Sequence, residues 1–497
     1  MNMDFSAGWT LVFVILTSLL IFFLSFKTIC KRGNLPPGPT PLPILGNILQ
    51  LKGGEMAKCV LELRKKYGDL FTVYFGSRPV VIVSGYKMVK EILVERGDEF
   101  LARGDMPTFD TYYKNYGFAF TNDMNRWKDL RRFSLITLRD FGMGKRSVED
   151  RIIDEARCLV VELKNTKESF LNPRQFFNQA ACNIIFSIMF GNRCDYENED
   201  LNAVLTYIYE TFVLISSIWG QIFDMFPRLM RILPGPHTKI LSHLEKLLKF
   251  VEKKVKINQE TLDPNNPRDY VDVFLIKLEK EKNDPHTDFN MTNLICSTLQ
   301  IFFAGVETIS TTLTYSLLIL MKYPKILANV QDEIDKVIGQ NRVPKLQDRN
   351  QMPYTEAVIH EIQRYIDLIP MGAPRKTTQD VQFKGYTLPK GTNVFPMLGS
   401  VLRDPACFPY PTEFNPQNFL TQNGDFQKND AFMPLSAGKR ICVGEALVRT
   451  ELFLFFVTIL QNFDLKSPVP REELDITPEV SGLGNFPKPY KVALISR

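Results

Sequence analysis

The chain has 497 residues, of which 45% are hydrophobic and 23% are charged, and its formal net charge is +5. This is the composition of an ordinary globular protein with enough chain for a large core. Its basic residues are scattered among acidic ones, which argues against nucleic acid as a partner. The eight cysteines never occur at C-x-x-C spacing and only four histidines are present, so neither a zinc site nor a disulfide framework is indicated.

An uncharged apolar run lies near the start of the chain, from residue 9 to residue 26. Its eighteen residues are enough for about one bilayer crossing. Asp4 precedes the run and basic residues from Lys27 onward follow it, whereas a cleaved signal peptide, the alternative, would carry its positive charges first. We therefore expect residues 1–32 to be a signal-anchor transmembrane segment, with the chain after Lys27 in the cytoplasm.

A proline-rich stretch follows the predicted anchor. Residues 35–43, LPPGPTPLP, contain five prolines, which hold the backbone in an extended form that excludes a helix. We expect residues 33–43 to be a stiff hinge between anchor and globule; the alternative is a proline motif that binds a partner. The sequence has no internal repeat and no later low-complexity linker, so residues 44–497 should form one domain.

Helical patterns dominate the predicted domain, and strand patterns are few. Residues 71–83 alternate around a turn and predict a hairpin, and residues 381–395 predict short strands joined at Gly385 and Gly391. Residues 294–321 carry a single charge and predict a helix about 42 Å long. A second membrane span is the alternative, but polar side chains near the middle favour a core helix that lines a cavity. The fold class is thus mainly α with a small β-sheet portion.

One cysteine stands apart from the others. In FMPLSAGKRICVGEAL, residues 432–447, Cys442 lies between Gly438 and Gly444 and just before an apolar helix, residues 444–460. The unpaired N–H groups of that helix's first turn would stabilise a thiolate. A buried structural thiol is the usual role for such a cysteine, and a nucleophile would need a base that the few histidines do not obviously supply. Ligation of a metal cofactor by the thiolate fits better.

The segment SAGKRICVGEAL resembles the haem-ligand loop of the cytochrome P450 superfamily, whose pattern is Phe-x-x-Gly-x-Arg-x-Cys-x-Gly. Leu435 occupies the usual phenylalanine position, a departure expected to alter redox tuning or haem packing without abolishing ligation. The segments GNILQL, LRDFGMGKRS and MPYTEAVIHEIQRY are similar to vertebrate microsomal family 2 enzymes, so the resemblance covers nearly the whole chain. It implies a cytochrome P450 fold, residues 44–497 as a haem-thiolate catalytic domain, and Cys442 as the axial ligand of the iron of haem b.

The resemblance also implies partners for the haem propionates. Trp127 and Arg131, in NRWKDLRR, resemble the helix that reaches these groups, although a basic cluster on a helix surface is the alternative. Three arginines match propionate-binding positions of the family by their sequence contexts KRIC, APRK and LARG: Arg440, Arg375 and Arg103. Arginine suits the role because its fork of N–H donors matches a carboxylate.

A further stretch matches a structural network of the family. Glu361 and Arg364, in HEIQRY, would pair on one helix face and hold a downstream loop, although this spacing alone usually marks a surface pair. Asn418 replaces the usual Arg or His of that network, so the third partner should be weaker here.

The segment AGVET, residues 304–308, resembles the oxygen-binding groove of the family's long distal helix. Ala304 and Gly305 would leave room over the iron, and Glu307 and Thr308 would be catalytic residues that relay protons. For Thr308 the alternative is a hydroxyl that bonds a carbonyl of its own helix.

The implied function is haem-thiolate monooxygenation, in which one atom of O2 enters a lipophilic small molecule such as a xenobiotic, a steroid or an unsaturated fatty acid like arachidonate. No G-x-G-x-x-G nucleotide fingerprint follows a strand, so electrons should come from another protein. The resemblance implies NADPH and a separate cytochrome P450 reductase, sometimes with cytochrome b5, at the endoplasmic reticulum membrane. The alternatives are a haem-thiolate isomerase of lipid peroxides and a non-catalytic haem sensor. The pair Glu307 and Thr308 argues against both.

Two surfaces are indicated by the same resemblance. Basic residues beside the haem motifs are predicted to receive the reductase: Arg126, Lys128, Arg132 and Lys439. The substrate cavity should draw on the long helix and on four other, mostly apolar regions: residues 108–120, 205–226, 369–373 and 482–486.

Overall fold

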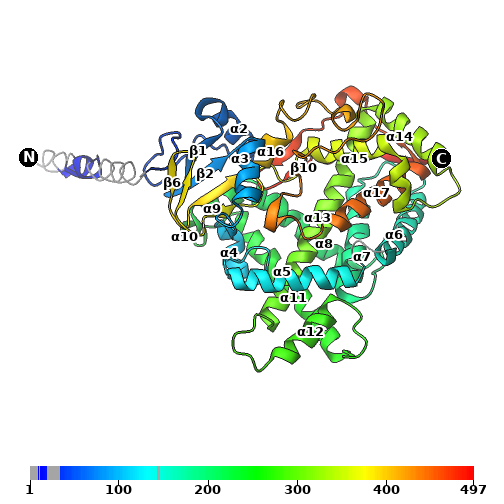
Figure 1. Ribbon diagram of the computed structural model, residues 1–497, viewed down its shortest axis with the longest axis horizontal. Coiled ribbons are helices and arrows are strands. Elements are labelled where there is room, and N and C mark those ends of the chain that lie inside the picture. Colours follow the sequence, from blue (N-terminus) through cyan, green and yellow to red (C-terminus); the bar gives the residue numbers. More distant parts are fainter. Residues whose placement is uncertain (1–8, 11, 19–33, 143–145) are drawn as a thin grey trace, which may run out of the picture.

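A computed structural model of the chain describes residues 9–10, 12–18, 34–142 and 146–497. It shows a mainly helical body with its principal sheet toward the N-terminal end of the molecule, which confirms the predicted fold class (Figure 1). In chain order, the α-helices are α2 (Met56–Tyr67), α3 (Tyr86–Lys90), α4 (Pro107–Tyr113), α5 (Met124–Asp140), α6 (Arg146–Asn165), α7 (Arg174–Phe190), α8 (Glu199–Ser216), α9 (Ile218–Met225), α10 (Pro227–Met230), α11 (His237–Glu260), α12 (Tyr270–Glu281), α13 (Met291–Lys322), α14 (Pro324–Val337), α15 (Pro353–Ile366), α16 (Leu398–Leu402) and α17 (Glu445–Asn462). The π-helical turn and the 3-10 helices are η1 (Glu91–Glu95), η2 (Leu346–Gln351), η3 (Pro416–Phe419), η4 (Gly438–Arg440) and η5 (Arg471–Glu473).

The strands of the described residues form a five-stranded sheet, in the order β1-β2-β7-β4-β3, and the two-stranded pairs β5–β6, β8–β11 and β9–β10. Their bounds are β1 (Leu70–Phe75), β2 (Arg78–Val83), β3 (Ala102–Arg103), β4 (Arg375–Lys376), β5 (Val381–Phe383), β6 (Tyr386–Leu388), β7 (Asn393–Pro396), β8 (Phe463–Lys466), β9 (Pro478–Ser481), β10 (Asn485–Pro487) and β11 (Ala493–Ser496). β1 and β2 are antiparallel, with Leu70 opposite Val83, which confirms the predicted hairpin. Val81 and Ile82 of β2 pack into different hydrophobic clusters, because successive strand side chains point to opposite faces.

The strands predicted within residues 381–395 lie in two different places. β5 and β6 form a hairpin of their own, closed by Lys384 and Gly385, whose φ angles are 52° and 86°. β7 instead lies parallel to β2, with Asn393 opposite Val80. Since most of the helices intervene between these two partners in the chain, local alternation could indicate the strands but not this pairing.

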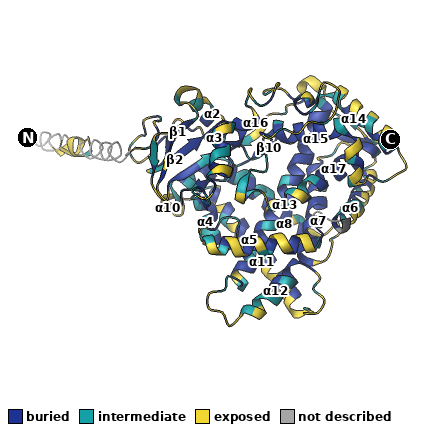
Figure 2. Cartoon of the chain, viewed as in Figure 1, coloured by how far each residue is buried: buried dark blue, intermediate teal, exposed yellow. Residues whose placement is uncertain are grey.

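The long helix predicted at residues 294–321 is α13, which runs through the buried centre of the helical body (Figure 2). The Asn290 side chain caps its first turn by accepting a hydrogen bond from the Asn293 N–H. Among the described residues α13 is the one helix long and apolar enough to cross a membrane by itself, but 72% of its most apolar window is buried inside the protein. That burial agrees with a core helix. α8 and α9 pass the same test only as a pair that is bent by 66°.

The predicted anchor, residues 1–32, lies largely outside the described residues; residues 9–10 and 12–18 are helical. The proline-rich segment is packed against the sheet. The Thr72 N–H of β1 donates to the Pro37 carbonyl at 3.0 Å, and a Cβ atom on Gly38 would overlap the Thr72 carbonyl oxygen. This segment therefore fixes where the chain leaves the domain toward the N-terminus.

Candidate active site around Cys442

Cys442 lies in the turn between η4 and α17, and its N–H donates to the Leu435 carbonyl at 3.1 Å. The turn requires glycine at position 438, where φ is 72° and a Cβ atom would overlap the Leu93 carbonyl oxygen. The close approach that the sequence predicts at Gly438 is therefore to η1 of the protein itself. A Cβ atom on Gly444 would lie 3.9 Å from the Cys442 Sγ, so this glycine leaves space beside the sulfur.

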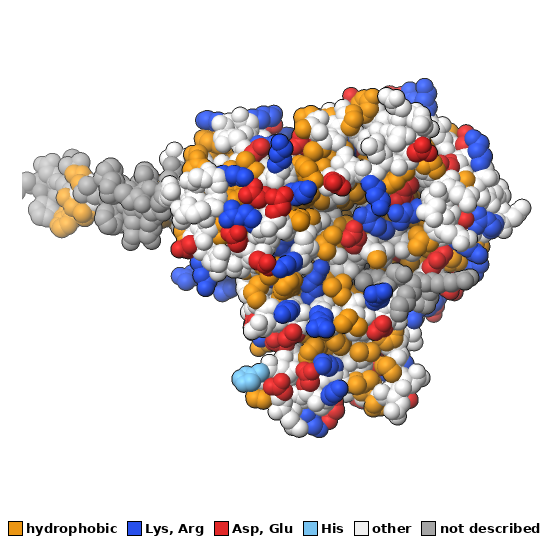
Figure 3. Space-filling view, in the orientation of Figure 1, with side chains coloured by type: hydrophobic (Ala, Val, Ile, Leu, Met, Phe, Trp, Pro, Cys, Tyr) orange, Lys and Arg blue, Asp and Glu red, His pale blue; other side chains and the backbone are white. Residues whose placement is uncertain are grey.

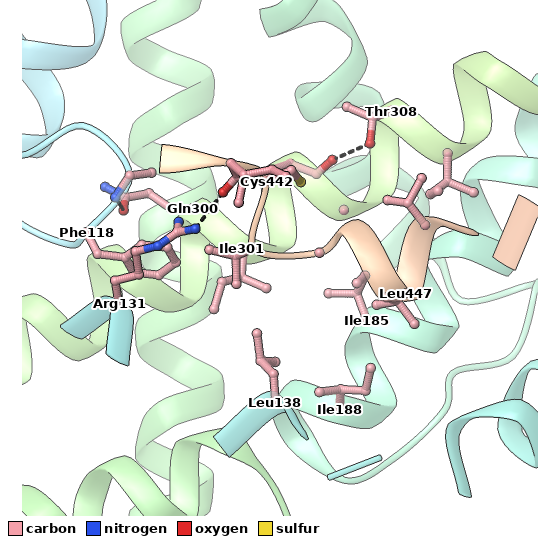
Figure 4. A pocket seen from close by; sticks show the side chains of 18 of the residues that line it. Phe118, Arg131, Leu138, Ile185, Ile188, Gln300, Ile301, Thr308, Cys442 and Leu447 are labelled. Carbon is pink, nitrogen blue, oxygen red and sulfur yellow. Dashed lines mark hydrogen bonds between the residues drawn. The ribbon is translucent and has the colours of Figure 1, made fainter. Parts of the chain in front are cut away.

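The Cys442 side chain borders an internal cavity of about 260 Å³ (Figure 4). The side chain has accessible surface although protein surrounds it, so that surface faces the cavity and not the bulk solvent. Burial raises the pKa of the thiol, while the Gly444 N–H and the Arg131 guanidinium act in the opposite direction. Apolar side chains from α5, α7, α13 and α17 form much of the cavity wall: Leu138, Ile185, Ile188, Met189, Ile301, Ile309, Leu447 and Val448.

The residues predicted for the distal helix lie on α13, and three of them line this cavity: Ala304, Gly305 and Thr308. A Cβ atom on Gly305 would lie 2.6 Å from Ile185 Cδ1, so glycine is what lets α13 pack this closely against α7. The Thr308 hydroxyl donates a 2.8 Å hydrogen bond to the Ala304 carbonyl, which is the alternative arrangement for this side chain. The oxygen of that hydroxyl can still accept hydrogen bonds from the cavity.

Glu307 does not join Thr308 at the cavity wall. Its side chain is 1% exposed and pairs with Arg174 on α7, with Arg174 Nη1 2.6 Å from Glu307 Oε1. Thr311 Oγ1 donates to the same oxygen at 2.8 Å. Burial raises the pKa of Glu307, and the adjacent Arg174 cation opposes that shift. The structure thus separates the two residues that the sequence groups as one proton relay.

Four of the residues predicted to bind the propionates line the cavity: Arg103, Trp127, Arg131 and Arg440. The fifth, Arg375 in β4, lies directly opposite Arg103 in β3. The Arg440 guanidinium lies 4.4 Å from the centre of the Trp127 ring, and its N–H groups donate to three backbone carbonyls at 3.1–3.2 Å. Helix α5, strands β3 and β4 and the Cys442 loop thus bring these side chains together from four parts of the chain.

The four arginines form a cationic cluster in which Arg375 and Arg440 are buried and Arg103 and Arg131 are half-buried, and no carboxylate in the described part of the chain pairs with any of them. Burial and the neighbouring arginines lower the pKa of Arg440 to about 7. Trp127 Nε1, Arg103 Nη1 and Arg375 Nε are buried without a hydrogen-bond partner among the described residues. Carboxylates of a bound ligand would satisfy these donors and offset the clustered charge. The thiol, the unpartnered donors and the apolar wall therefore fit haem, which these residues would hold.

Glu361 and Arg364 form a two-point ion pair on α15, with both side chains fully buried (0% exposed). Arg364 Nε and Nη2 each donate to a Glu361 oxygen at 2.7 Å, and Arg364 also donates to the carbonyls of Pro411 and Glu413 at 2.7–2.8 Å. Asn418 Nδ2 donates to both Glu361 oxygens at 3.2 Å. These bonds are longer than those from Arg364, as the sequence departure at this position leads one to expect, because the amide donor of Asn418 carries no charge.

Two charged residues near α13 were not among the sequence predictions. Glu451 on α17 lines the cavity, its Oε1 is buried without a partner among the described residues, and burial raises its pKa well above the ordinary value. Arg174, the partner of Glu307, is the first residue of α7. An acid in the apolar part of a helix was a usable signal for Glu451, whereas no local pattern connects Arg174 with Glu307.

Aromatic side chains from the predicted substrate regions pack together next to α13. Phe109 stacks on Phe120 with ring centres 4.4 Å apart, and Phe212 stacks on Phe303 of α13 at 4.2 Å. Of the four predicted regions outside α13, only residues 108–120 reach the wall of the cavity at Cys442, through Phe118 and Ala119.

The sequence matches the family model described as Cytochrome P450 over residues 36–494. The chain belongs to the cytochrome P450 family. It is 49% identical to Cytochrome P450 2G1 and 50% identical to Cytochrome P450 2B4, both of Oryctolagus cuniculus, over 495 residues that cover 100% of each chain. It is 48% identical to Cytochrome P450 2A5 of Mus musculus, over 480 residues and 97% of each chain. The resemblance to family 2 that the motifs carry is confirmed.

This cytochrome P450 is a haem-thiolate monooxygenase and thus an oxidoreductase, and haem is its cofactor. As a family 2 member it is a microsomal enzyme associated with the endoplasmic reticulum membrane, and it acts on a small molecule with electrons from a redox partner. The cavity at Cys442 is where the residues described above fit its haem.

Proposed function

We propose that this cytochrome P450 inserts one oxygen atom into a lipophilic small molecule, with Cys442 as the axial ligand of the haem iron. The observation that carries the proposal is that the Cys442 side chain and the unpartnered donors of Trp127 and Arg103 border one largely apolar cavity. Haem bound there supplies the activation of O2, and a thiolate ligand favours cleavage of the O–O bond.

The cationic cluster has the role of binding and orienting the propionates. The indole N–H of Trp127 and the guanidinium groups of Arg103, Arg131, Arg375 and Arg440 supply hydrogen-bond donors from four parts of the fold. Pairing with carboxylates offsets the repulsion among the four clustered cations. The apoprotein carries that repulsion without compensation, so the cluster also links haem binding to stability.

α13 provides the opposite wall of the site. Ala304 has a side chain of one methyl group and leaves space over the haem, and Gly305 lets α13 pack closely against Ile185 beside it. The Thr308 hydroxyl holds a water molecule by accepting a hydrogen bond from it and so fixes the position of a proton. Glu307, on an adjoining face of the helix, is the acid that replenishes this proton.

The substrate classes that we infer are xenobiotics, steroids and unsaturated fatty acids such as arachidonate. The aromatic stacks of Phe109 with Phe120 and of Phe212 with Phe303 give the substrate region apolar walls, which favour lipophilic molecules. A substrate that enters this region must separate rings that are now in contact.

Electrons reach this site, in our proposal, from NADPH through a membrane-bound cytochrome P450 reductase, with cytochrome b5 as a second donor. Of the four basic residues predicted for the docking surface, Arg126 pairs with Asp288 at 2.7 Å and Lys439 pairs with Asp98 at 2.6 Å, so the test uses the other two. Lys128 and Arg132 are exposed on α5. Reversing these two charges should slow reduction by the reductase in a salt-dependent way and leave reduction by dithionite unchanged.

The membrane arrangement that we propose follows from the sequence. Residues 1–32 anchor the chain in the endoplasmic reticulum membrane, residues 33–43 connect the anchor to the domain, and residues 44–497 form the catalytic domain on the cytoplasmic side. Glycosylation acceptors added at the carboxyl end should stay unmodified, whereas modification there would contradict this orientation.

The deciding experiment adds NADPH and reductase to the purified full chain and measures oxygen uptake with each of the three substrate classes. We expect uptake that depends on substrate and yields a product one oxygen atom heavier. An isomerase would instead convert lipid peroxides without NADPH, and a haem sensor would bind ligands without consuming oxygen. Either of those outcomes, with no substrate-dependent uptake, would overturn the proposal.

A further inference from the structure

The α4–α5 loop, residues 114–123, supplies backbone carbonyls to two arginines of the cationic cluster. Arg103 Nε donates to the Ala119 carbonyl at 2.8 Å, and Arg440 donates to two further carbonyls of the loop at 3.2 Å each. These bonds fix the planes of both guanidinium groups. The position of the loop therefore decides where their remaining N–H groups point, including Arg103 Nη1, which is buried without a partner among the described residues.

Two side-chain amides on α13 hold the middle of this loop. Asn293 Oδ1 accepts a hydrogen bond from the Gly117 N–H at 2.9 Å. About two turns further along the helix, Gln300 accepts from the Ala119 N–H at 2.9 Å and donates to the Tyr116 carbonyl at 3.1 Å. Position 117 requires glycine, because φ is 73° there and a Cβ atom would overlap the Gln300 amide. The loop is thus seated on the helix that forms one wall of the cavity.

The start of the loop is held by Arg126, on the first turn of α5. Its Nε donates to Asp288 Oδ1 at 2.7 Å, and its Nη1 donates to the Asn115 carbonyl at 3.0 Å. The guanidinium also lies 5.1 Å from the centre of the Tyr116 ring. The Asp288 carbonyl accepts in turn from Asn293 Nδ2 at 2.8 Å. Arg126, whose side chain is 19% exposed, therefore joins the start of α5, the loop and the segment before α13.

We propose that Arg126 is a positioning residue for the haem site and that it acts with Asp288 as a clamp on the α4–α5 loop. The clamp keeps the loop carbonyls where they orient Arg103 and Arg440 to bind the propionates. The sequence assigns Arg126 to the docking of a reductase, but its guanidinium is already engaged by a carboxylate, a carbonyl and a ring of the same chain. Basic and acidic side chains are interspersed over the face that carries α5, which agrees with pairing inside the chain (Figure 3). This inference rests on the propionate role proposed above for the cationic cluster.

The test uses the full-chain holoenzyme and compares the wild type with Arg126→Gln and Asp288→Ala. Two quantities are measured: the propionate bending band in the resonance Raman spectrum, and the rate of haem loss to an excess of apomyoglobin. The first reports the hydrogen bonds of the propionates directly, so a general loss of stability does not shift it.

The matched control is Arg497→Gln, at the C-terminus of the chain. Arg497 also pairs with an aspartate, Asp335, at 2.7 Å, and its side chain is 15% exposed. It also donates to a backbone carbonyl, that of Leu460, at 2.8 Å. The control thus removes the same kinds of contact away from the α4–α5 loop.

In Arg126→Gln we expect the propionate band to shift to lower frequency, because weaker hydrogen bonds to the carboxylates lower it, and haem loss to become several-fold faster. Asp288→Ala should produce the same two changes, although it makes this face more positive while Arg126→Gln makes it less so. The double variant should differ little from either single variant, since the two side chains act as one clamp. The control should show neither change.

An unshifted band in Arg126→Gln and Asp288→Ala would overturn the inference even if both variants lost haem faster. A docking role for Arg126 would also overturn it. That role predicts slower reduction by the reductase in Arg126→Gln, faster reduction in Asp288→Ala and an unshifted band in both.

The variant Arg103→Met separates failure of this inference from failure of the propionate role. If Arg103→Met leaves the band unshifted, the cluster does not bind the propionates, and both proposals are wrong. If Arg103→Met shifts the band and the two clamp variants do not, the propionate role stands and the role given to Arg126 is wrong.

Discussion

Arg103 and Arg375 are paired directly opposite each other on the antiparallel strands β3 and β4, two like charges at one register position. Such a pair destabilises a sheet unless something compensates the charge. Arg375 is 3% exposed, and burial together with Arg103 and Arg131 lowers its pKa well below the ordinary value. The strands therefore hold an electrostatic cost that a bound anion would relieve, which supports the proposal that both arginines bind the haem propionates.

The first prediction concerns the charge of the ligand. Haem dimethyl ester, in which both propionates are neutral, should bind the apoprotein at least tenfold more weakly than haem, because each hydrogen bond to a charged group contributes about 1.5–3 kcal/mol. Titration of the apoprotein, followed by absorbance, measures both affinities. Arg375→Met should weaken haem binding and reduce the difference in affinity between haem and its ester. Equal binding of both ligands by the wild type would contradict the propionate role of the cluster.

The second prediction concerns the axial ligand. Cys442→Ser should lose the reduced carbon monoxide band that is typical of thiolate-ligated haem, and much of its haem, because the hydroxyl does not supply a thiolate. Cys407→Ser, outside the cavity, is the control and should keep the band. A difference spectrum of reduced protein with and without carbon monoxide decides the matter. If Cys442→Ser retained the band, another residue would have to be the ligand.

Local patterns were sufficient for the elements of the fold whose stability is set by nearby residues. The hairpin of β1 and β2 shows two β-branched and aromatic runs around a turn, and α13 shows an apolar run too long for a strand. The parallel pairing of β2 with β7 and the short pairs β8–β11 and β9–β10 depend on contacts between distant segments. Two- to four-residue strands leave no periodicity to recognise, so the sequence alone could not place them.

The sequence predicts the site residues that belong to motifs, but it does not predict contacts that depend on how the helices pack. Cys442, Trp127 and Arg440 come from motifs, and the structure brings them to one cavity. Consecutive residues of a helix point about 100° apart, so helical geometry itself indicates that Glu307 and Thr308 cannot face the same cavity in the same way. The contact of Glu307 with Arg174 depends on how α7 packs on α13, which no sequence spacing encodes.

The third prediction tests the buried ion pair of α15. Glu361→Gln should destabilise the protein by about 3–5 kcal/mol, because it leaves the Arg364 cation buried without its partner. The control is Glu62→Gln, which removes an exposed ion pair with Lys65 and should change stability by about 1 kcal/mol or less. Urea unfolding of the two variants, followed by circular dichroism, provides the comparison. Similar midpoints for both would contradict the structural role of Glu361.

The fourth prediction concerns pH. Burial raises the pKa of Asp367 to about 6, so the folded protein holds a proton there that the unfolded chain, with a pKa near 3.8, has released. Stability from this group is therefore highest below about pH 4 and falls as the pH rises through about 6. Asp367→Asn removes the titration, and asparagine tolerates the left-handed backbone at this position, where φ is 47°.

The variant should therefore match the wild type near pH 4 and be more stable above pH 7, by on the order of 2–3 kcal/mol, since one pKa unit corresponds to about 1.4 kcal/mol. Unfolding midpoints measured between pH 5 and pH 8 would show the two proteins diverging as the pH rises. A constant difference over that range would mean that the Asp367 carboxyl is not the titrating group.

The last prediction concerns Thr308, whose hydroxyl bonds the Ala304 carbonyl and also faces the cavity. If the hydroxyl only satisfied its own helix, Thr308→Ala would alter stability slightly and leave the reaction unchanged. If it positions a water molecule for proton delivery, the same variant keeps haem, the thiolate spectrum and substrate affinity but diverts NADPH into hydrogen peroxide. We expect the second result.

The chain offers a matched control on the next turn of the same helix. Thr312 Oγ1 makes the same kind of bond, to the Thr308 carbonyl at 2.7 Å, but its side chain is not part of the cavity wall. Thr312→Ala should therefore stay coupled, and Thr308→Ser, which keeps a hydroxyl, should be largely coupled as well. Hydrogen peroxide and product, each measured per NADPH, separate the cases. Both alanine variants lose a hydrogen bond within the helix, so a difference in coupling between them reports the position at the cavity. If Thr308→Ala stays as well coupled as the wild type, proton delivery does not need this hydroxyl.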